Sequence, residues 1–165
     1  MELISDNAFD LHVDYFLNSQ SLIDSTFQYN NTNDTSTEKY VYNPARQLTR
    51  LYEYDYTTVA GSSLWNRTDY TYDGSGNLIK EEDIDNWVTT YEYYTDKRYV
   101  MPQVLPFQAS NDKISLVKKA VLTIPGVTPI IVNFTYTFDS KDRISTAKEE
   151  GSNGYTIIKT YTYFD

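Results

Sequence analysis

The sequence predicts an all-β protein, an antiparallel meander of about ten strands that forms a curled open sheet or an incomplete barrel. Three observations predict this class: apolar and polar residues alternate with period two along most of the chain, tyrosine occurs 17 times, and turn motifs separate the alternating runs. Successive side chains of a strand point to opposite faces, so each run has one aromatic face and one polar face. Tyrosine suits a half-buried face because its ring is apolar and its hydroxyl is polar.

The alternating runs are distributed over the whole chain, at residues 9–15, 48–56, 64–72, 87–93, 130–138 and 155–163. The segment 112–122 fits either a helical turn or a strand, and its β-branched residues favour a strand. Polar loops or turns are predicted at residues 30–37, 60–63, 73–77 and 151–154. The longest break, at residues 95–112, contains two prolines and is predicted to be an insertion loop.

A transmembrane barrel is the structural alternative, because its strands also alternate apolar and polar residues between aromatic girdles. Both strand faces of this chain carry charges, however, as Lys80 and Glu82 do beside Glu81 and Asp83. A belt of residues that faces lipid lacks such charges, so the open or partly closed sheet is favoured.

The composition argues against several kinds of site and partner. There are 23 Asp and Glu against 14 Lys and Arg, and the net charge of −9 repels phosphate backbones, so no nucleic acid partner is predicted. Cysteine is absent, which excludes disulfides, thiolate metal sites and cysteine nucleophiles. No stretch approaches the roughly 18 apolar residues of a transmembrane helix. The residues after Met1 do not form a signal peptide, which fits a cytosolic chain or one whose leader was removed.

One pattern recurs along the chain: aromatic-x-aromatic-Asp, two further residues, a Gly or polar residue, one more residue and an aliphatic. Its best copy is Tyr70–Leu78, its second is Tyr136–Ile144, and a degraded copy with Asn43 in place of Asp is Tyr40–Leu48. The Asp or Asn opens a turn by accepting hydrogen bonds from nearby amides. Such units, at residues 38–56, 68–94 and 130–165, bury little alone, so a single domain over residues 1–165 is predicted.

These residues resemble known families. The Tyr70–Leu78 copy resembles the YD repeat of Rhs-type proteins, with its Tyr-x-Tyr-Asp-x-x-Gly-Asn-Leu consensus. The second half, with Leu105-Pro106-Phe107 and a final Tyr-x-Tyr, is similar to an uncharacterised family of bacterial surface or periplasmic lipoprotein domains with a porin-like fold. The resemblance covers residues 38–165 and implies a bacterial extracytoplasmic location, with a lipid anchor on a removed leader. Only one copy is intact, so the encapsulation function of long Rhs repeats is not carried over, and neither family supplies catalytic residues.

No catalytic residue, metal site or cofactor is predicted. His12 is the single histidine, and an exposed strand histidine is a simpler interpretation than a general base. Glu81 and Asp83 share one strand face, as the carboxylate pair of a glycosidase must, but a solvated strand end accounts for them. The segment Asp73–Asn77 has oxygen groups at a spacing that calcium uses, but a hairpin turn explains each of its residues.

Exposed aromatic residues form the predicted ligand-binding set: Trp65, Trp87, Tyr94, Tyr99 and Phe107. They do not all fit one buried face; Trp65, for example, has the opposite parity to Leu64 and Tyr70. Flat rings on a sheet stack on sugars or anchor a protein, although a sheet covered on both sides would also explain them. We therefore predict a non-enzymatic extracytoplasmic binding or scaffold domain for a glycan or protein partner. The alternative is a carbohydrate-acting hydrolase with paired carboxylates. The oligomeric state is left open.

Overall fold

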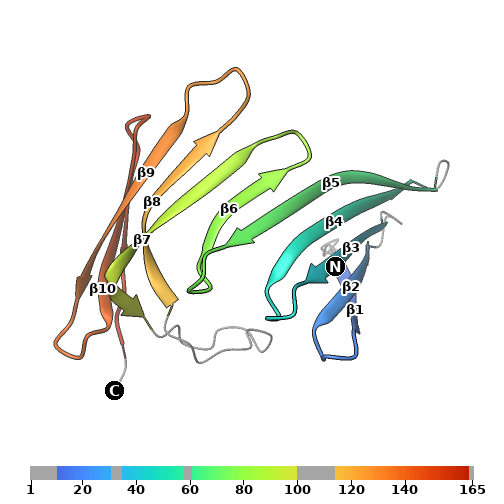
Figure 1. Ribbon diagram of the computed structural model, residues 1–165, viewed down its shortest axis with the longest axis horizontal. Coiled ribbons are helices and arrows are strands. Elements are labelled where there is room, and N and C mark those ends of the chain that lie inside the picture. The colour runs from blue at the N-terminus through green and yellow to red at the C-terminus, as the bar shows by residue number, and fades with distance from the viewer. Residues whose placement is uncertain (1–10, 31–34, 58–60, 100–113, 164–165) are drawn as a thin grey trace, which may run out of the picture. The chain divides into compact units, whose positions relative to one another are not determined.

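The computed structural model describes residues 11–30, 35–57, 61–99 and 114–163, in which all regular structure is β-strand (Figure 1). The strands are β1 (Leu11–Leu17), β2 (Ile23–Asn30), β3 (Thr35–Tyr42), β4 (Leu48–Thr57), β5 (Gly61–Tyr72), β6 (Leu78–Asp83), β7 (Val88–Tyr99), β8 (Ile114–Thr123), β9 (Ile130–Phe138), β10 (Ile144–Gly151) and β11 (Thr156–Thr160). They form one antiparallel sheet in sequence order, with β1 and β11 at its two ends. The prediction of an all-β meander in an open sheet is therefore confirmed. Among the described residues, no helix is long and apolar enough to cross a membrane.

The contacts of the chain group into two compact units, Met1–Asp69 and Tyr70–Asp165. The first unit contains β1 to β4 and most of β5, and the second contains the end of β5 and β6 to β11. The assignment of residues 1–165 to a single domain stays a prediction.

Several predicted loops are shorter in the structure than the sequence indicated. Segment 112–122 is a strand, as favoured, because β8 occupies most of it. The predicted loop 95–112 begins too early, because β7 continues to Tyr99. The alternating pattern breaks before that residue because the pairing of β7 with β8 shifts register between Tyr93 and Arg98. Strands also extend into the predicted turns 30–37 and 60–63. In the first of these segments, Thr35 and Thr37 are β-branched and favour extended structure.

A five-residue turn joins successive strands in both units. In the copy at residues 73–77, Gly76 N donates to Asp73 O over 3.0 Å, and Asp73 N donates to Asn77 O over 2.9 Å. Oδ1 of Asp73 accepts hydrogen bonds from the amides of Ser75 and Asn77, at 2.8 and 2.9 Å. Gly76 has a φ of 87°, a left-handed conformation that glycine adopts without a steric cost. The hairpin turn predicted here is confirmed.

The same backbone hydrogen bonds recur in the turns 18–22, 43–47, 83–87, 139–143 and 151–155. In each of these turns the fourth residue has a positive φ: Ser21 at 58°, Arg46 at 64°, Asn86 at 62°, Asp142 at 57° and Gly154 at 91°. The first residue is Asn or Asp in all but the last, and its side chain accepts amide hydrogen bonds within its own turn. The repeat pattern identified the copies that begin at Asn43, Asp73 and Asp139, and it missed those that begin at Asn18 and Asp83.

Arg46→Gly is expected to raise the free energy of unfolding by about 1 kcal/mol, because a residue with a Cβ pays roughly 1–2 kcal/mol for the left-handed conformation. The Arg46 side chain loses little, since its only recorded hydrogen bond in the described chain is an exposed one of 3.3 Å to Gln20 O. Urea unfolding measures the change. Arg46→Ala is the control, because it removes the side chain and keeps the strain. Equal stability of the Gly and Ala variants would contradict the explanation.

Acid is expected to destabilise the turns that begin with aspartate. Hydrogen bonds lower the pKa of Asp73, chiefly those from Asn77, and the pKa of Asp139, chiefly that from the Arg143 amide. A carboxyl whose pKa is lower in the folded state stabilises the protein above its unfolded pKa of about 3.9, and this contribution is lost as the pH falls through the folded pKa. Melting temperatures measured from neutral to acidic pH should therefore drop most steeply below about pH 4.

The double variant Asp73→Asn and Asp139→Asn provides the control for this acid effect. Asparagine keeps the amide-accepting oxygen, as Asn43 does when it accepts from Gln47 N at 3.0 Å, but it does not titrate. The variant should lose less of its melting temperature between neutral and acidic pH than the wild type. Parallel pH profiles would show that these two carboxylates do not cause the acid sensitivity.

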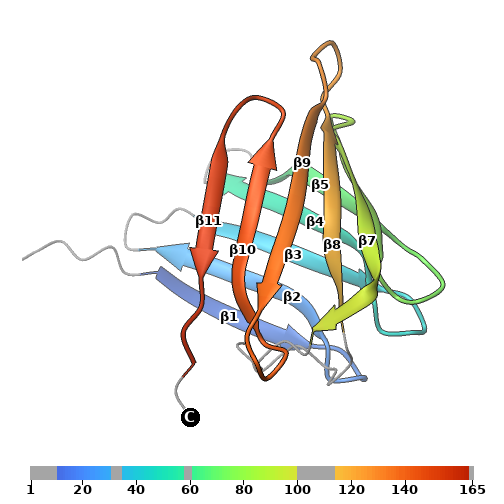
Figure 2. The same ribbon diagram turned by 90° about the vertical axis from the view of Figure 1, so that its left-hand side faces the viewer.

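The second unit has a small core on one face of its sheet, formed by residues of β7, β8, β9 and β10. Figure 2 shows these four strands side by side. Leu116, Ile144 and Ala147 are buried, and the aromatic rings of Tyr94, Tyr136 and Phe138 pack against them. The Tyr94 and Tyr136 rings meet edge to face, with centroids 6.2 Å apart. Burial raises the pKa of Tyr136 to about 12. Tyrosine thus supplies much of this core, as the composition predicted.

Candidate functional site

The register of β2 to β5 gives the first unit one acidic face. Register partners of an antiparallel pair point to the same side of the sheet. Two rows cross the strands in this way: Thr26, Glu38, Glu53 and Asn66 form one, and Gln28, Ser36, Asp55 and Ser63 form the other. All eight residues are polar and three are carboxylates. We call this side the acidic face.

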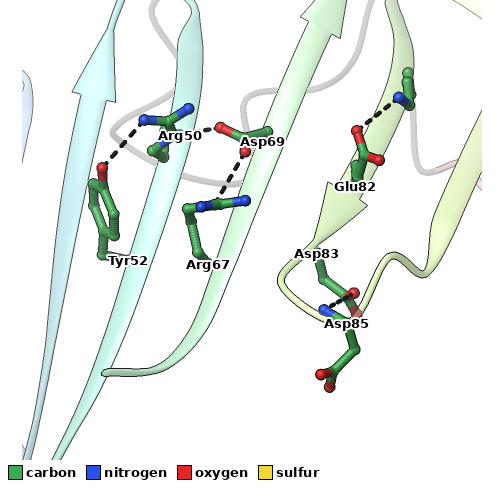
Figure 3. A network of polar contacts seen from close by, with 8 residues as sticks. Arg50, Tyr52, Arg67, Asp69, Glu82, Asp83 and Asp85 are labelled. Carbon is green, nitrogen blue, oxygen red and sulfur yellow. Dashed lines mark hydrogen bonds and ion pairs between the residues drawn. The ribbon is translucent and has the colours of Figure 1, made fainter. Parts of the chain in front are cut away.

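The opposite face of the same strands carries basic and aromatic side chains. Lys39, Tyr52 and Arg67 are register partners there. Figure 3 shows that Asp69 lies between two arginines: it pairs with Arg50, and its Oδ2 is 3.1 Å from Arg67 Nε. The positive charge of Arg50 and Arg67 is thus directed away from the acidic face and is partly neutralised by Asp69. The sheet separates its charges by side.

Trp65 sits at a β-bulge on β5. Glu53 pairs with Asn66 and Tyr54 pairs with Leu64, so Trp65 has no partner on β4. A bulge inserts one residue and re-aims the side chains around it. Trp65 consequently lines the acidic face, and its side chain remains 54% exposed. The parity argument for Trp65 was right that it does not share a face with Leu64. It was wrong in placing Leu64 and Tyr70 on one face, because the bulge lies between them.

A groove with a volume of about 230 Å³ opens on the acidic face next to this tryptophan. It is lined by Gln28, Ser36, Thr37, Glu38, Glu53, Asp55 and Trp65, which come from β2, β3, β4 and β5. The groove therefore combines one exposed indole with carboxylate, amide and hydroxyl groups. The sequence predicted Trp65 but missed the polar lining, for which the only signal was the polar parity of Glu53 and Asp55 between tyrosines.

Neutral groups hold the two central carboxylates of the groove. Oε2 of Glu38 accepts hydrogen bonds from Thr26 Oγ1, at 3.1 Å, and from the Tyr40 hydroxyl. Burial, followed by the hydrogen bond to Glu38, raises the pKa of Tyr40 well above its usual range. Oε2 of Glu53 accepts from Asn66 Nδ2 at 2.6 Å. In the described part of the chain, neither Glu38, Glu53 nor Asp55 forms an ion pair, and Oε1 of both glutamates is left without a donor.

Comparison with solved structures shows the fold to which this arrangement belongs. A porin-like protein from Bacteroides uniformis superposes with a TM-score of 0.61 and 13% sequence identity, over 91% of this chain and 66% of the other. This chain has a porin-like β fold. It spans just under two thirds of the length of that neighbour. No protein-family model and no curated protein matches the sequence.

The other predicted aromatic residues are placed differently in the porin-like sheet. Trp87 ends the turn 83–87 in the second unit and is 48% exposed. Tyr94 is not on an exposed face: it is half-buried in the core, and its hydroxyl donates to Phe134 O over 2.9 Å. Tyr99 is the last residue of β7, and Phe107 lies outside the described residues. Trp65 lines the groove.

The His12 and Asp83 side chains, which were candidates for catalytic chemistry, both contact neighbouring residues of the fold. The His12 ring stacks on Tyr29, with centroids 5.0 Å apart. Oδ1 of Asp83 accepts hydrogen bonds from the amides of Asp85 and Trp87, both at 2.9 Å, so this carboxylate organises its turn. Figure 3 shows the contact with Asp85. No group of three or more potential metal ligands comes together in the residues that the structure describes.

Proposed function

We propose that this chain is a non-enzymatic binding domain of the bacterial extracytoplasm that holds a glycan in the groove beside Trp65. One observation carries the proposal: an indole that is 54% exposed at a bulge forms a wall of a groove whose other walls are hydrogen-bonding groups. The apolar face of a sugar ring stacks on a flat aromatic ring, and its hydroxyls donate to carboxylates and amides. A small number of polar groups around an aromatic surface is typical of ligand sites.

The location and family form part of the same proposal. The intact Tyr70–Leu78 copy supports a relationship of this chain to YD-repeat proteins. The porin-like fold supports a relationship to the family of bacterial surface or periplasmic lipoprotein domains. The named neighbour is a bacterial porin-like protein, which supports a location outside the cytoplasm.

Calorimetric titration of the purified chain with a panel of soluble glycans tests the binding function. We expect saturable binding to at least one glycan, and we expect Trp65→Ala to weaken it at least about fivefold, because loss of a stacking ring at a binding site costs about 1 kcal/mol or more. Trp87→Ala is the matched control, since Trp87 is similarly exposed but lies at a turn in the other unit. Glycan binding that both variants retain would overturn the Trp65 groove as the binding site. No binding across the panel would overturn the glycan proposal and direct the search to protein partners.

A carbohydrate-acting hydrolase is the second candidate, and the facing pair Glu38 and Glu53 favours it. A glycosidase places its two carboxyl groups on either side of the scissile bond. Glu38 and Glu53, as register partners, instead lie side by side on one surface of the sheet. This arrangement suits a binding site better than a hydrolase. Release of reducing sugar that is abolished by Glu53→Gln would support the hydrolase, whereas bound glycan recovered intact would exclude it.

A further inference from the structure

We infer that the groove beside Trp65 selects an amine-bearing sugar, a glycan with free ammonium groups, over neutral and anionic glycans. This inference rests on the proposed glycan function and names its substrate class. It starts from the pairing of β3 with β4, which sets Glu38 directly opposite Glu53. Like charges in this position destabilise a sheet. A cation bound between the two carboxylates would therefore stabilise this part of the sheet.

The side chains around this pair do not supply that cation. The hydrogen bonds of Glu38 and Glu53 come from a threonine, a tyrosine and an asparagine, all neutral. Asp55 adds a third carboxylate to the lining of the same groove. The nearby basic residues point to the opposite face, where Lys39 lies over the Tyr54 ring and the arginines pair with Asp69.

The remaining acceptor atoms and the indole suit an ammonium group on a sugar. Oε1 of Glu38 and of Glu53 has no donor among the described residues, so each can accept a hydrogen bond from a ligand without giving up an existing one. An ammonium group supplies three donors and no acceptor. The exposed face of Trp65 attracts cations as well as the apolar face of a sugar ring. A carboxylate on a ligand would be repelled by all three acids.

The experiment compares two oligosaccharides of one backbone: glucosamine oligomers, which carry free amines, and their fully N-acetylated counterparts. Titrations are made with the full chain, at a pH that keeps the amines protonated and at low salt. We expect the glucosamine oligomer to bind at least tenfold more tightly, with the difference shrinking as ionic strength rises to about 0.15 M. Glu53→Gln should weaken its binding about tenfold, because glutamine keeps an acceptor for Asn66 and removes the charge.

One control separates a specific site from general attraction to a chain of net charge −9. Glu92→Gln removes one charge from an exposed carboxylate that pairs with Lys119 in the other unit, and it should leave binding unchanged. Glu53→Gln should also raise the melting temperature of the unliganded chain, because it relieves the repulsion with Glu38.

Each result has a defined meaning. Preference for the amine form that depends on both Trp65 and Glu53 supports the inference. Equal, Trp65-dependent binding of the two oligomers overturns the inference and leaves the glycan function standing. Amine binding that Trp65→Ala and Glu53→Gln do not weaken is a bulk charge effect and also overturns it. Failure of every glycan to bind removes both proposals.

Discussion

Leu116→Ala is expected to lower the free energy of unfolding of the second unit by about 3 kcal/mol. Leu116 is only 8% exposed and belongs to a buried cluster of three residues, with Ile144 and Ala147. Deleting its side chain removes apolar burial and leaves a cavity that two neighbouring strands, fixed by hydrogen bonds, fill only in part. Few other side chains are buried among the residues that the structure describes.

The measurement uses the two tryptophans, because they report on different units. In a Trp65→Phe background, the fluorescence of Trp87 follows unfolding of the second unit in urea. Ile158→Ala is the control: Ile158 is 63% exposed on β11, and its truncation should change stability by less than about 0.5 kcal/mol. If the two substitutions cost the same, the cluster around Leu116 is not the centre of this unit's stability.

The architecture could be predicted from the sequence because its determinants are local. The alternation of apolar and polar residues predicts the strands directly. Turns such as 73–77 are predicted by an Asp-Gly pair and a glycine at the fourth position. The turns that begin at Asn18 and Asp83 were missed because the pattern requires two aromatic residues before the Asp or Asn. Leu17 takes one of these positions before Asn18, and Lys80 and Glu82 take both before Asp83. Their determinant is the first side chain, which accepts two amide hydrogen bonds in each case. A search keyed to that residue would have found them.

The site was predicted only in part because it depends on register. Trp65 stood out as a residue that alternation could not place, and it is exposed. Its face, however, is set by a bulge, which inserts one residue without changing the composition of the strand. Glu38 and Glu53 are 15 positions apart, and only the pairing of β3 with β4 brings them together. Cross-strand register comes from tertiary contacts, which one sequence does not display.

Gly151→Ala is expected to destabilise the β10–β11 hairpin by about 2 kcal/mol, because an added methyl group has no room. A Cβ at this position would overlap the Tyr155 ring, lying 2.5 Å from its Cδ1, and would be 2.6 Å from Asn153 Oδ1. The backbone holds the two residues together, since Gly151 N donates to Tyr155 O over 3.0 Å. The ring must therefore leave its position on the turn. Urea unfolding followed by Trp87 fluorescence measures the cost.

A double-mutant cycle identifies the clash as the cause. If the Tyr155 ring is what the methyl group meets, Gly151→Ala should cost little in a Tyr155→Ala background, which gives a coupling energy of about 1 kcal/mol or more between the two positions. Gly74→Ala is the matched glycine control, because no heavy atom lies within 4 Å of a Cβ there. A cost at Gly151 that persists without the Tyr155 ring would mean that the backbone, and not the aromatic side chain, requires glycine. This copy of the turn begins with Gly151 and therefore lacks the Asn or Asp side chain that begins the other copies, and Tyr155 is its last residue. The cycle thus measures how much the Tyr155 ring, packed over the backbone, stabilises this turn.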